Sequence, residues 1–189
     1  ANDTDEPVLH YGPVTNRTVW RSPVTDAIDY VVIAGPSATE VMGGYRELLG
    51  ATPMLPIWAF GYVHCRERFH SSAEIIETLD EFRRRALPLD VIVQDWQYWG
   101  SHGWNAMRFD ETHYPDPKRL IDEIHKRDAR FMLSVWARID PSSELGQEFA
   151  QRGYFIDGTD WVDFFNPEAA AFYAAEQETR LRRFGIDAW

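Results

Sequence analysis

Cysteine is almost absent from this chain: Cys65 is the only one among 189 residues. A single cysteine cannot form an internal disulfide or a zinc site built from several thiolates. Long apolar runs are also lacking, because no stretch of about 18 apolar residues occurs that could span a membrane. The N-terminus, ANDTDEPVLH, has neither the basic start nor the apolar centre of a signal peptide. We therefore predict no disulfide and no membrane partner, and the sequence leaves the cellular compartment undecided.

Positive charge is also in short supply, since 19 Lys and Arg residues face 30 Asp and Glu residues, for a formal net charge of -11. Nucleic-acid binding depends on clustered basic side chains that displace counterions from phosphates. The arginine runs FRRR and RRFG fall where we expect helix C-termini, and cations there complement the helix dipole. The composition therefore argues against a nucleic-acid partner.

Signatures of metal and cofactor binding are missing as well. His102 and His113 have no second His or Cys at ligand spacing, so the sequence predicts no metal site. No G-x-G-x-x-G follows the first expected strand of the second domain, which counts against a dinucleotide fold. We predict no cofactor.

What is present is material for a core, because 44% of the residues are hydrophobic and 14% are aromatic. Up to Gly50 the chain carries short apolar segments, RTVW and DYVVIAG, which we interpret as strands at the end of a β-domain. A helix with Ser37 as N-cap, Glu40 three residues later and Gly50 at its end completes this part. The loop GATPMLP follows. The predicted domains are residues 1–50 and 51–189.

From Ile57 onward apolar strands alternate with helices. IWAFGYVH, DVIVQD and RFMLSVWA read as strands, and GIDAW opens a fourth. Helix starts are expected at Ser71, Asp116 and Asn166, with an irregular region, YFIDGTDWVDFF, before the last. Such a pattern predicts an α/β fold with a parallel sheet, either the first half of a (β/α)8 barrel or a doubly wound sheet. Without a dinucleotide motif, the half-barrel is favoured.

Both architectures place function at the carboxyl ends of the parallel strands. Phe69 follows the first strand, Asp95 and Trp96 the second, and Trp136 the third. A carboxylate accepts hydrogen bonds from hydroxyl groups, and an aromatic ring packs against the C–H face of a sugar. These residue types at these places indicate a carbohydrate site.

Three segments carry a family resemblance: PMLPIWAFGYVHCRERF, then PLDVIVQDWQYWGSHGWNAMRFDETHYPDPKRLIDEIHKRDARFMLSVW, then the terminal GIDAW. In this order they resemble glycoside hydrolase family 31, the retaining α-glycosidases. IVQDWQYW and DAW are most similar to its α-xylosidase-like branch. The resemblance implies the end of an N-terminal β-sandwich followed by the first four strands of a catalytic barrel.

The resemblance also implies roles for individual residues. Asp95 matches the family acid that hydrogen-bonds sugar hydroxyls in the first subsite, with Trp96 as the adjacent wall; the alternative is an Asp that caps the following loop. Trp136 either lines the same pocket or fills the top of the barrel. Phe69, in the C-R-E-R-F segment, either contacts sugar or does not, and the sequence favours neither.

The two catalytic carboxyl groups of a retaining glycosidase are expected outside this sequence, with the Asp nucleophile just beyond Trp189 and the general acid on a later strand. The chain alone is therefore expected to be inactive. The implied parent hydrolyses α-xylosides or α-glucosides of oligosaccharides. A family member that transfers such sugars, an inactive carbohydrate-binding barrel fragment, and a homo-oligomeric parent are alternatives that the sequence leaves open.

Two further groups of residues allow more than one interpretation. Tyr98, Trp99 and Trp104 lie in one long loop and form either a packed loop with its own small core or a distal sugar platform. Several acids lie near the end of the chain, and we interpret them as turn and cap residues, not as nucleophiles: Asp160, Asp163 and Asp187.

Overall fold

The computed structural model describes every residue except 1–7, 13–16, 22–26 and 28. The chain divides into two compact units, Ala1–Met54 and Leu55–Trp189. The division falls within GATPMLP, the segment that the sequence predicts as a loop between domains.

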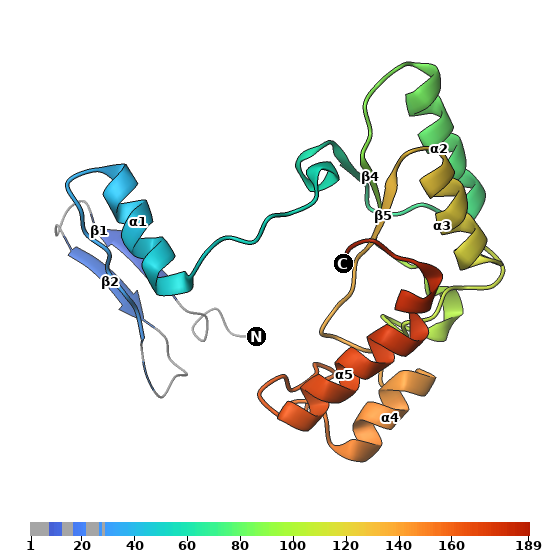
Figure 1. Cartoon of the computed structure of the whole chain (residues 1–189). Coiled ribbons are helices and arrows are strands. Elements are labelled where there is room, and N and C mark those ends of the chain that lie inside the picture. Colours follow the sequence, from blue (N-terminus) through green and yellow to red (C-terminus); the bar gives the residue numbers. More distant parts are fainter. Residues whose placement is uncertain (1–7, 13–16, 22–26, 28) are drawn as a thin grey trace. The chain divides into compact units, whose positions relative to one another are not determined.

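The first unit contains an antiparallel strand pair and one helix (Figure 1). Strand β1 (Val8–Gly12) pairs with β2 (Arg17–Arg21), which confirms the strand predicted at RTVW. Helix α1 (Ala38–Leu49) begins where Ser37 Oγ accepts a hydrogen bond from the backbone N–H of Glu40, and it ends at Gly50 with a φ of 88°. Both ends are as the sequence predicts.

The strand predicted at DYVVIAG is wrong, because residues 29–35 form no strand in the structure. An apolar run becomes a strand only where a neighbouring strand offers backbone hydrogen-bond partners. Val31 and Val32 are instead exposed.

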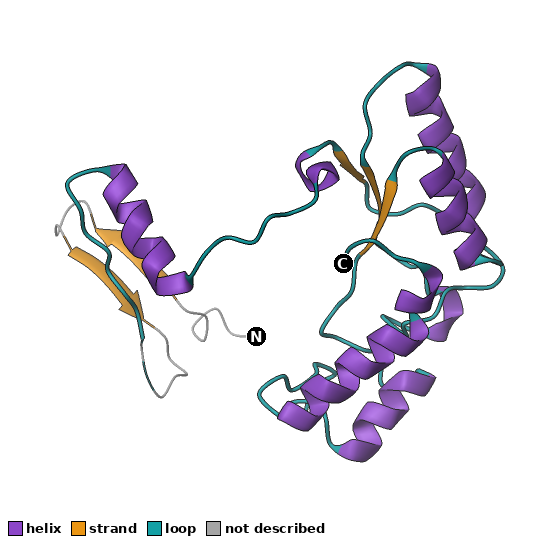
Figure 2. Cartoon of the chain, viewed as in Figure 1, coloured by secondary structure: helices purple, strands orange, loops and turns teal. Residues whose placement is uncertain are grey.

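The second unit is built on a three-stranded parallel sheet in the order β3-β4-β5 (Figure 2). The strands are β3 (Val63–Cys65), β4 (Val91–Gln94) and β5 (Arg130–Leu133). All four residues of the central strand β4 are buried, which explains why its first three, Val91 to Val93, are apolar. Helix α2 (Ser72–Arg84) connects β3 to β4, and helix α3 (Pro117–Lys126) lies between β4 and β5 in the chain. The predicted parallel α/β arrangement is confirmed.

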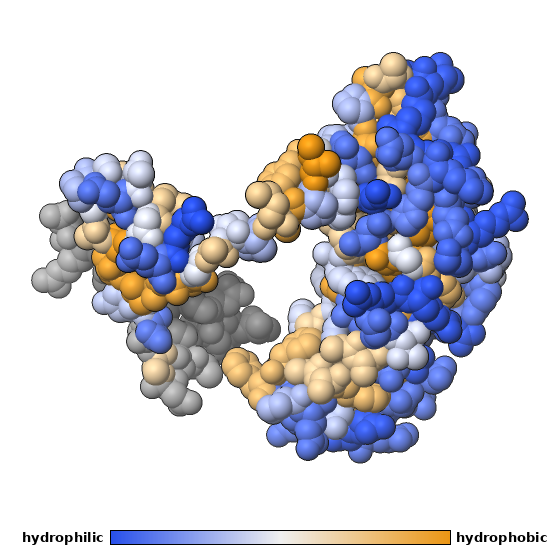
Figure 3. Space-filling model, in the orientation of Figure 1, coloured by the Kyte–Doolittle hydropathy of each residue, from blue (hydrophilic) through white to orange (hydrophobic). Residues whose placement is uncertain are grey.

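The first strand of this unit is shorter than predicted. Ile57–Phe60 forms a 3-10 helix, η1, and Ile57 and Phe60 are largely exposed. Pro56 precedes this turn, and its carbonyl accepts the N–H of Ala59, so the chain curls before it extends. Apolar atoms therefore reach the surface over η1, whereas the outer side of α2 and α3 is hydrophilic (Figure 3).

The predicted helix starts are confirmed by side-chain caps. Ser71 Oγ accepts from the backbone N–H of Glu74, and Asp116 caps α3 with Pro117 at its first position. Asn166 and Pro167 open helix α5 (Pro167–Arg180) in the same way, and a short 3-10 helix, η3 (Arg182–Phe184), follows it.

Helix α4 (Glu144–Arg152) was not predicted from the sequence. Only two large apolar side chains of this short helix are buried, Leu145 and Phe149, and Gly146 in its first turn lowers the helix propensity. The cap Ser143 and the left-handed Gly153 were the available signals.

The segment GIDAW runs beside β5 in the direction that the predicted fourth strand requires. Ala188 forms an isolated parallel bridge with Met132, and the carbonyl of Ala188 accepts the N–H of Leu133 at 3.1 Å.

Among the residues that the structure describes, no helix is long and apolar enough to cross a membrane.

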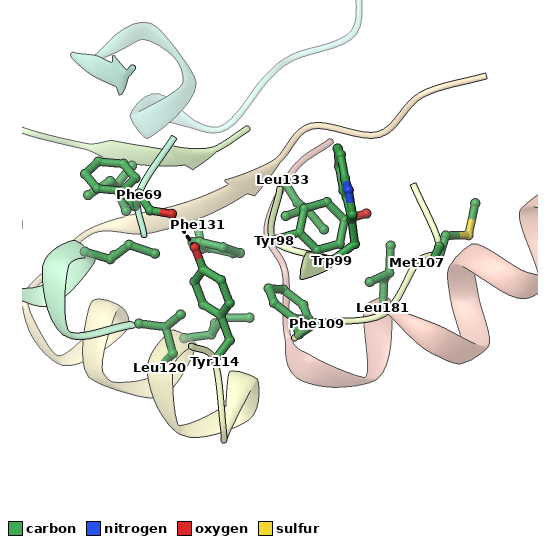
Figure 4. Close-up of a cluster of buried hydrophobic side chains, with 14 of the residues drawn as sticks. Phe69, Tyr98, Trp99, Met107, Phe109, Tyr114, Leu120, Phe131, Leu133 and Leu181 are labelled. Carbon is green, nitrogen blue, oxygen red and sulfur yellow. Dashed lines mark hydrogen bonds between the residues drawn. The ribbon is translucent and has the colours of Figure 1, made fainter. Parts of the chain in front are cut away.

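The core of the second unit joins the sheet to the helices and to the long loop after β4. Tyr98 and Trp99 from that loop lie among the buried side chains, with Phe109 and Met107 from farther along it (Figure 4). The loop thus contributes its own apolar residues to the core and does not simply cover it. Side chains from the sheet and helices complete the cluster: Leu120, Phe131, Leu133 and Leu181.

Candidate carbohydrate site

The segments that follow the three strands meet at one edge of the sheet. Strand β4 lies between β3 and β5. Beyond it, the backbone N–H of Trp96 donates to the carbonyl of Glu67 at 3.0 Å, and the N–H of Ser134 donates to the carbonyl of Gln94 at 3.0 Å. These hydrogen bonds link the ends of all three strands, so the residues predicted there share one edge.

Asp95 occupies the first position after β4 and is half-buried. Its Oδ1 atom is buried and has no hydrogen-bond partner among the residues that the structure describes. A buried carboxylate oxygen without a donor is costly, and native structures keep few such atoms without a functional reason. The charge of Asp95 also acts on its neighbour: burial, reinforced by this carboxylate, raises the pKa of the Cys65 thiol. Asp95 therefore offers an unused acceptor beside a protonated thiol.

Four indole rings form what we call the tryptophan cluster: Trp96, Trp99, Trp104 and Trp136. Trp104 is at its centre, with ring centroids 4.4 Å from Trp96 and 5.3 Å from Trp136, both in edge-on geometry. The Trp99 ring lies 5.5 Å away. The Nε1 atoms of Trp104 and Trp136 are buried, and neither has an acceptor among the described residues. The cluster thus contains two indole N–H donors without an acceptor, and its member Trp96 follows Asp95 directly in the sequence.

This combination suits a ligand rich in hydroxyl groups. A hydroxyl donates to a carboxylate oxygen and also accepts from an indole N–H. Indole faces pack against the C–H faces of a sugar ring, while their N–H groups stay available. Four residues were predicted to bind substrate. Two of them, Asp95 and Trp96, are neighbours in the sequence, and the ring of Trp104 contacts the rings of both Trp96 and Trp136.

Phe69, the fourth, is placed differently. Its side chain is 1% exposed and lies in the hydrophobic core (Figure 4). The Arg66 guanidinium covers its ring at 4.6 Å, and its carbonyl accepts a hydrogen bond from the Tyr114 hydroxyl. In this structure Phe69 has no free face for a sugar, and it supports the segment after β3 from below.

The charged residues of that segment also have partners. Arg66 pairs with Glu74 of α2. Arg68 lies 3.7 Å from Glu67 and donates to Gln97 at 2.6 Å, so it contacts both its sequence neighbour and the loop after β4. These contacts add to the hydrogen bond between Trp96 and Glu67.

The long loop after β4 behaves as a packed loop for two of its aromatic residues. Tyr98 is fully buried and Trp99 is 3% exposed, which excludes them as an open sugar platform in this structure. Burial raises the pKa of Tyr98. Trp104 is only half-buried and belongs to the tryptophan cluster. We therefore add it to the candidate site, a role that the sequence left open.

Asn105 is a site residue that sequence reasoning missed. It is fully buried, has a φ of 53°, and its Nδ2 donates to the carbonyl of Trp136 at 2.6 Å. Asn is one of the few residues that tolerate positive φ, so an Asn within an aromatic loop was the signal that could have found it.

The remaining acids have structural partners. Asp160 pairs with Arg138 at 2.7 Å, Asp163 accepts the N–H of Phe165 at 3.0 Å, and Asp187 accepts the N–H of Phe131 at 2.9 Å. Only the contact of Asp163, two residues along the chain, is of the predicted turn and cap kind. Asp160 instead forms an ion pair, and Asp187 binds the backbone of a distant strand, because these acids pair across the fold. In the part of the chain that the structure describes, no group of three His, Cys, Asp or Glu side chains is arranged to hold a metal ion.

Comparison with known protein families gives a match over most of this chain. Residues 52–189 match the family described as "Glycosyl hydrolases family 31 TIM-barrel domain". An α-xylosidase of Saccharolobus solfataricus is 44% identical over 146 residues, which are 77% of this chain and 20% of that protein. Alpha-glucosidase 2 of Bacillus thermoamyloliquefaciens is 32% identical over 151 residues, 77% of this chain and 19% of that protein. The chain thus spans about a fifth of the length of these relatives.

Solved structures show the same likeness. A GH31 α-xylosidase from Xanthomonas citri superposes with a TM-score of 0.75 and 32% identity, over 82% of this chain and 19% of that one. A GH31 α-xylosidase from a soil metagenome, complexed with xylose, gives a TM-score of 0.73 and 29% identity over 82% of this chain and 25% of that one. With the family pattern covering residues 52–189 and a parallel α/β unit to match, this chain belongs to glycoside hydrolase family 31.

Proposed function

We propose that the chain is part of a retaining α-glycoside hydrolase that acts on α-xylosides or α-glucosides of oligosaccharides. The observation that carries this proposal is the unpartnered carboxylate oxygen of Asp95 at the end of β4, next to the tryptophan cluster with its two unused N–H donors. The named relatives, an α-xylosidase and an α-glucosidase, supply the substrate class.

The chain's own residues bind and orient the sugar in this proposal. Asp95 accepts from hydroxyl groups of the non-reducing sugar, Trp96 forms the adjoining wall, and Trp136 donates from Nε1. Phe69 acts only by supporting the segment after β3, because its side chain is buried.

The covalent chemistry is assigned to two carboxyl groups outside this sequence. A retaining glycosidase needs one carboxylate to attack the anomeric carbon and one acid to protonate the leaving oxygen, about 5 Å apart. We place the Asp nucleophile in the segment that follows Trp189 in a complete barrel, since Ala188 already runs parallel to β5. A single Asp95 cannot take both roles, so in this proposal its role is confined to binding the sugar.

We also infer the architecture of the parent protein. The antiparallel pair of β1 and β2 supports residues 1–50 as the last part of a β-sandwich domain with its linking helix. The parallel sheet and the parallel bridge at Ala188 support residues 51–189 as the first four βα units of a (β/α)8 barrel.

The choice between xylose and glucose depends on the room left for one hydroxymethyl group, a difference of about 1 to 3 kcal/mol in transition-state binding. The bulk of Trp96 beside Asp95 favours the smaller sugar, xylose. Ratios of kcat/KM for aryl α-xylosides and aryl α-glucosides measure this directly.

The test of the proposed function is Asp95→Asn in a protein that carries this chain together with the barrel residues that its relatives have. Replacing a charged acceptor weakens each hydrogen bond by about 1.5 to 3 kcal/mol, so kcat/KM on an aryl α-glycoside should fall by roughly tenfold to a hundredfold. The matched control is Asp90→Asn, directly before the same strand, where Oδ2 of Asp90 accepts the backbone N–H of Tyr62 at 2.8 Å.

Each outcome discriminates. Loss of turnover in Asp95→Asn with normal turnover in Asp90→Asn supports the sugar-binding role. Equal kinetics for Asp95→Asn and the unsubstituted protein would remove Asp95 from the site. Analysis of the products separates hydrolysis from sugar transfer, and sugar binding without turnover in a complete barrel would identify an inactive carbohydrate-binding protein.

A further inference from the structure

The main-chain carbonyl of Trp136 accepts hydrogen bonds from two side chains that come from distant segments. Asn105, in the loop after β4, donates from Nδ2 at 2.6 Å. Tyr173, on helix α5, donates from its hydroxyl at 2.8 Å. Three segments, the loop after β4, the residues after β5 and helix α5, thus meet at one oxygen atom.

Both side chains that donate to this carbonyl are buried. Asn105 is fully buried and Tyr173 is 8% exposed. The Tyr98 hydroxyl lies 3.5 Å from Oδ1 of Asn105, which leaves Nδ2 for the carbonyl of Trp136. Burial raises the pKa of Tyr173, so its hydroxyl keeps its proton and remains a donor.

The backbone at Asn105 has an unusual conformation for a residue with a side chain. Its φ of 53° lies in the left-handed region. Asn adopts this region more readily than most residues with a side chain. Here the conformation places the Asn105 amide within hydrogen-bond distance of the carbonyl of Trp136.

Trp136 needs such support because regular pairing has ended before it. Strand β5 stops at Leu133, and residues 134–137 have no regular secondary structure. The Trp136 ring packs edge-on against Trp104, and its Nε1 has no acceptor among the described residues. A small rotation of this peptide would move the ring and its unused N–H together.

We propose that Asn105 and Tyr173 are positioning residues that fix the ring and Nε1 of Trp136 for a sugar hydroxyl, through the carbonyl that they share. This rests on the proposed function, because the ligand is the sugar assigned there. We call the pair the Trp136 clamp. Neither residue touches the sugar, and both act on the tryptophan that does.

A purely structural role would give a different result. If the two hydrogen bonds served only stability, their removal would lower the unfolding midpoint and leave the orientation of Trp136 and the sugar affinity unchanged. The experiment therefore needs one readout for the tryptophan and one for the ligand.

The variants are Tyr173→Phe, which removes one hydroxyl, and Asn105→Gly, which accepts positive φ but lacks the amide. The matched control is Tyr154→Phe, because the Tyr154 hydroxyl contacts the exposed Glu168 at 3.4 Å and not Trp136. Near-ultraviolet circular dichroism of this chain reports the coupled tryptophan rings. We expect the tryptophan bands to weaken in both variants and to stay unchanged in the control, with equal far-ultraviolet spectra.

The ligand readout uses the chain within a complete barrel, titrated with xylose and with glucose. One of the two sugars will bind more tightly to the unsubstituted protein. Each clamp variant should bind that sugar roughly fivefold to tenfold more weakly than the unsubstituted protein does, as expected for the loss of one hydrogen bond that orients a donor. The double variant should lose more than the product of the two single effects, because the carbonyl then has no side-chain donor. The control should bind as the unsubstituted protein does.

The outcomes separate the two proposals. Unchanged tryptophan bands in both variants overturn the clamp, as does unchanged sugar affinity in a protein that binds sugar. If the unsubstituted barrel binds neither sugar, the proposed function fails, and the circular dichroism alone still decides whether the clamp orients Trp136. If Asn105→Gly does not fold, Tyr173→Phe and its control decide.

Discussion

Nε2 of His125 lies 2.7 Å from Oδ2 of Asp187, a hydrogen bond between residues 62 positions apart. The same carboxylate oxygen accepts the backbone N–H of Phe131 at 2.9 Å. These two bonds join the last turn of α3, the start of β5 and the segment that continues to Ala188. Asp187 thus holds the final segment in place beside β5, where Ala188 bridges to Met132.

Replacing Asp187 by Ala should destabilise the second unit. The change leaves the N–H of Phe131 without its side-chain acceptor, and a lost hydrogen bond to a charged group costs about 1.5 to 3 kcal/mol. Urea unfolding measures the difference. Asp157→Ala, at an exposed turn position, is the control and should stay within about 0.5 kcal/mol of the unsubstituted chain. Equal losses for both variants would contradict a special role for Asp187.

A second prediction about stability concerns Tyr114. Its hydroxyl is buried, donates to the carbonyl of Phe69 and lies 3.1 Å from Oε1 of Gln94 (Figure 4). Tyr114→Phe keeps the ring and removes the donor, so two buried acceptors lose their partner, at a cost of about 1 to 3 kcal/mol. The unfolding midpoint in urea should fall. The control is Tyr45→Phe on the exposed side of α1, and its unfolding midpoint should stay unchanged.

Two glycines within helices should respond to Ala in opposite directions. A β-carbon on Gly146 of α4 would collide with the carbonyl oxygen of Asp140, whereas one on Gly43 of α1 would meet no atom within 4 Å. Gly146→Ala should therefore destabilise the second unit by about 1 to 3 kcal/mol. Gly43→Ala should stabilise α1 by up to about 1 kcal/mol through helix propensity. A stabilising Gly146→Ala would show that α4 can move away from Asp140 without cost.

The acid side of the stability curve should depend on Glu111. Arg108, together with His102, lowers the pKa of Glu111 from 4.5 to about 2. Because the folded pKa is below the unfolded one, the contribution is complete above pH 4.5 and disappears as the pH falls toward 2. Glu111→Gln should therefore show a shallower loss of thermal stability across this window. High salt should reduce the difference, because the pair is exposed and screened.

Much of the fold follows from local signals. Ser37, Ser71, Asp116 and Asn166 begin helices where the sequence predicts them, because their side chains satisfy the free N–H groups of the first turn. The apolar run Val91–Val93 predicted a buried strand, and the structure places it at the centre of the sheet. The run at residues 29–35 looked similar and is no strand, because strand formation needs a partner that local sequence does not specify.

The residue types of the candidate site could be predicted from the sequence, and its geometry could be predicted less well. Asp95, Trp96 and Trp136 stand at strand ends because a parallel sheet delivers such positions to one edge. Phe69 has a similar position in the sequence and lies in the core, because Arg66 covers its ring and the Tyr114 hydroxyl binds its carbonyl. Nothing in the local sequence distinguishes an aromatic ring that lines a pocket from one that lies below it.

The alternation of the three parallel strands with helices α2, α3 and α5, the caps of these helices and the family could be read from the amino-acid sequence, because each depends on neighbouring residues or on a continuous motif. The tertiary structure alone showed that Trp104 lies between Trp96 and Trp136 and that Asn105 and Tyr173 share the carbonyl of Trp136. These contacts join residues far apart in the chain. They depend on the packing of the loop after β4 against β5 and α5, which sequence periodicity does not encode.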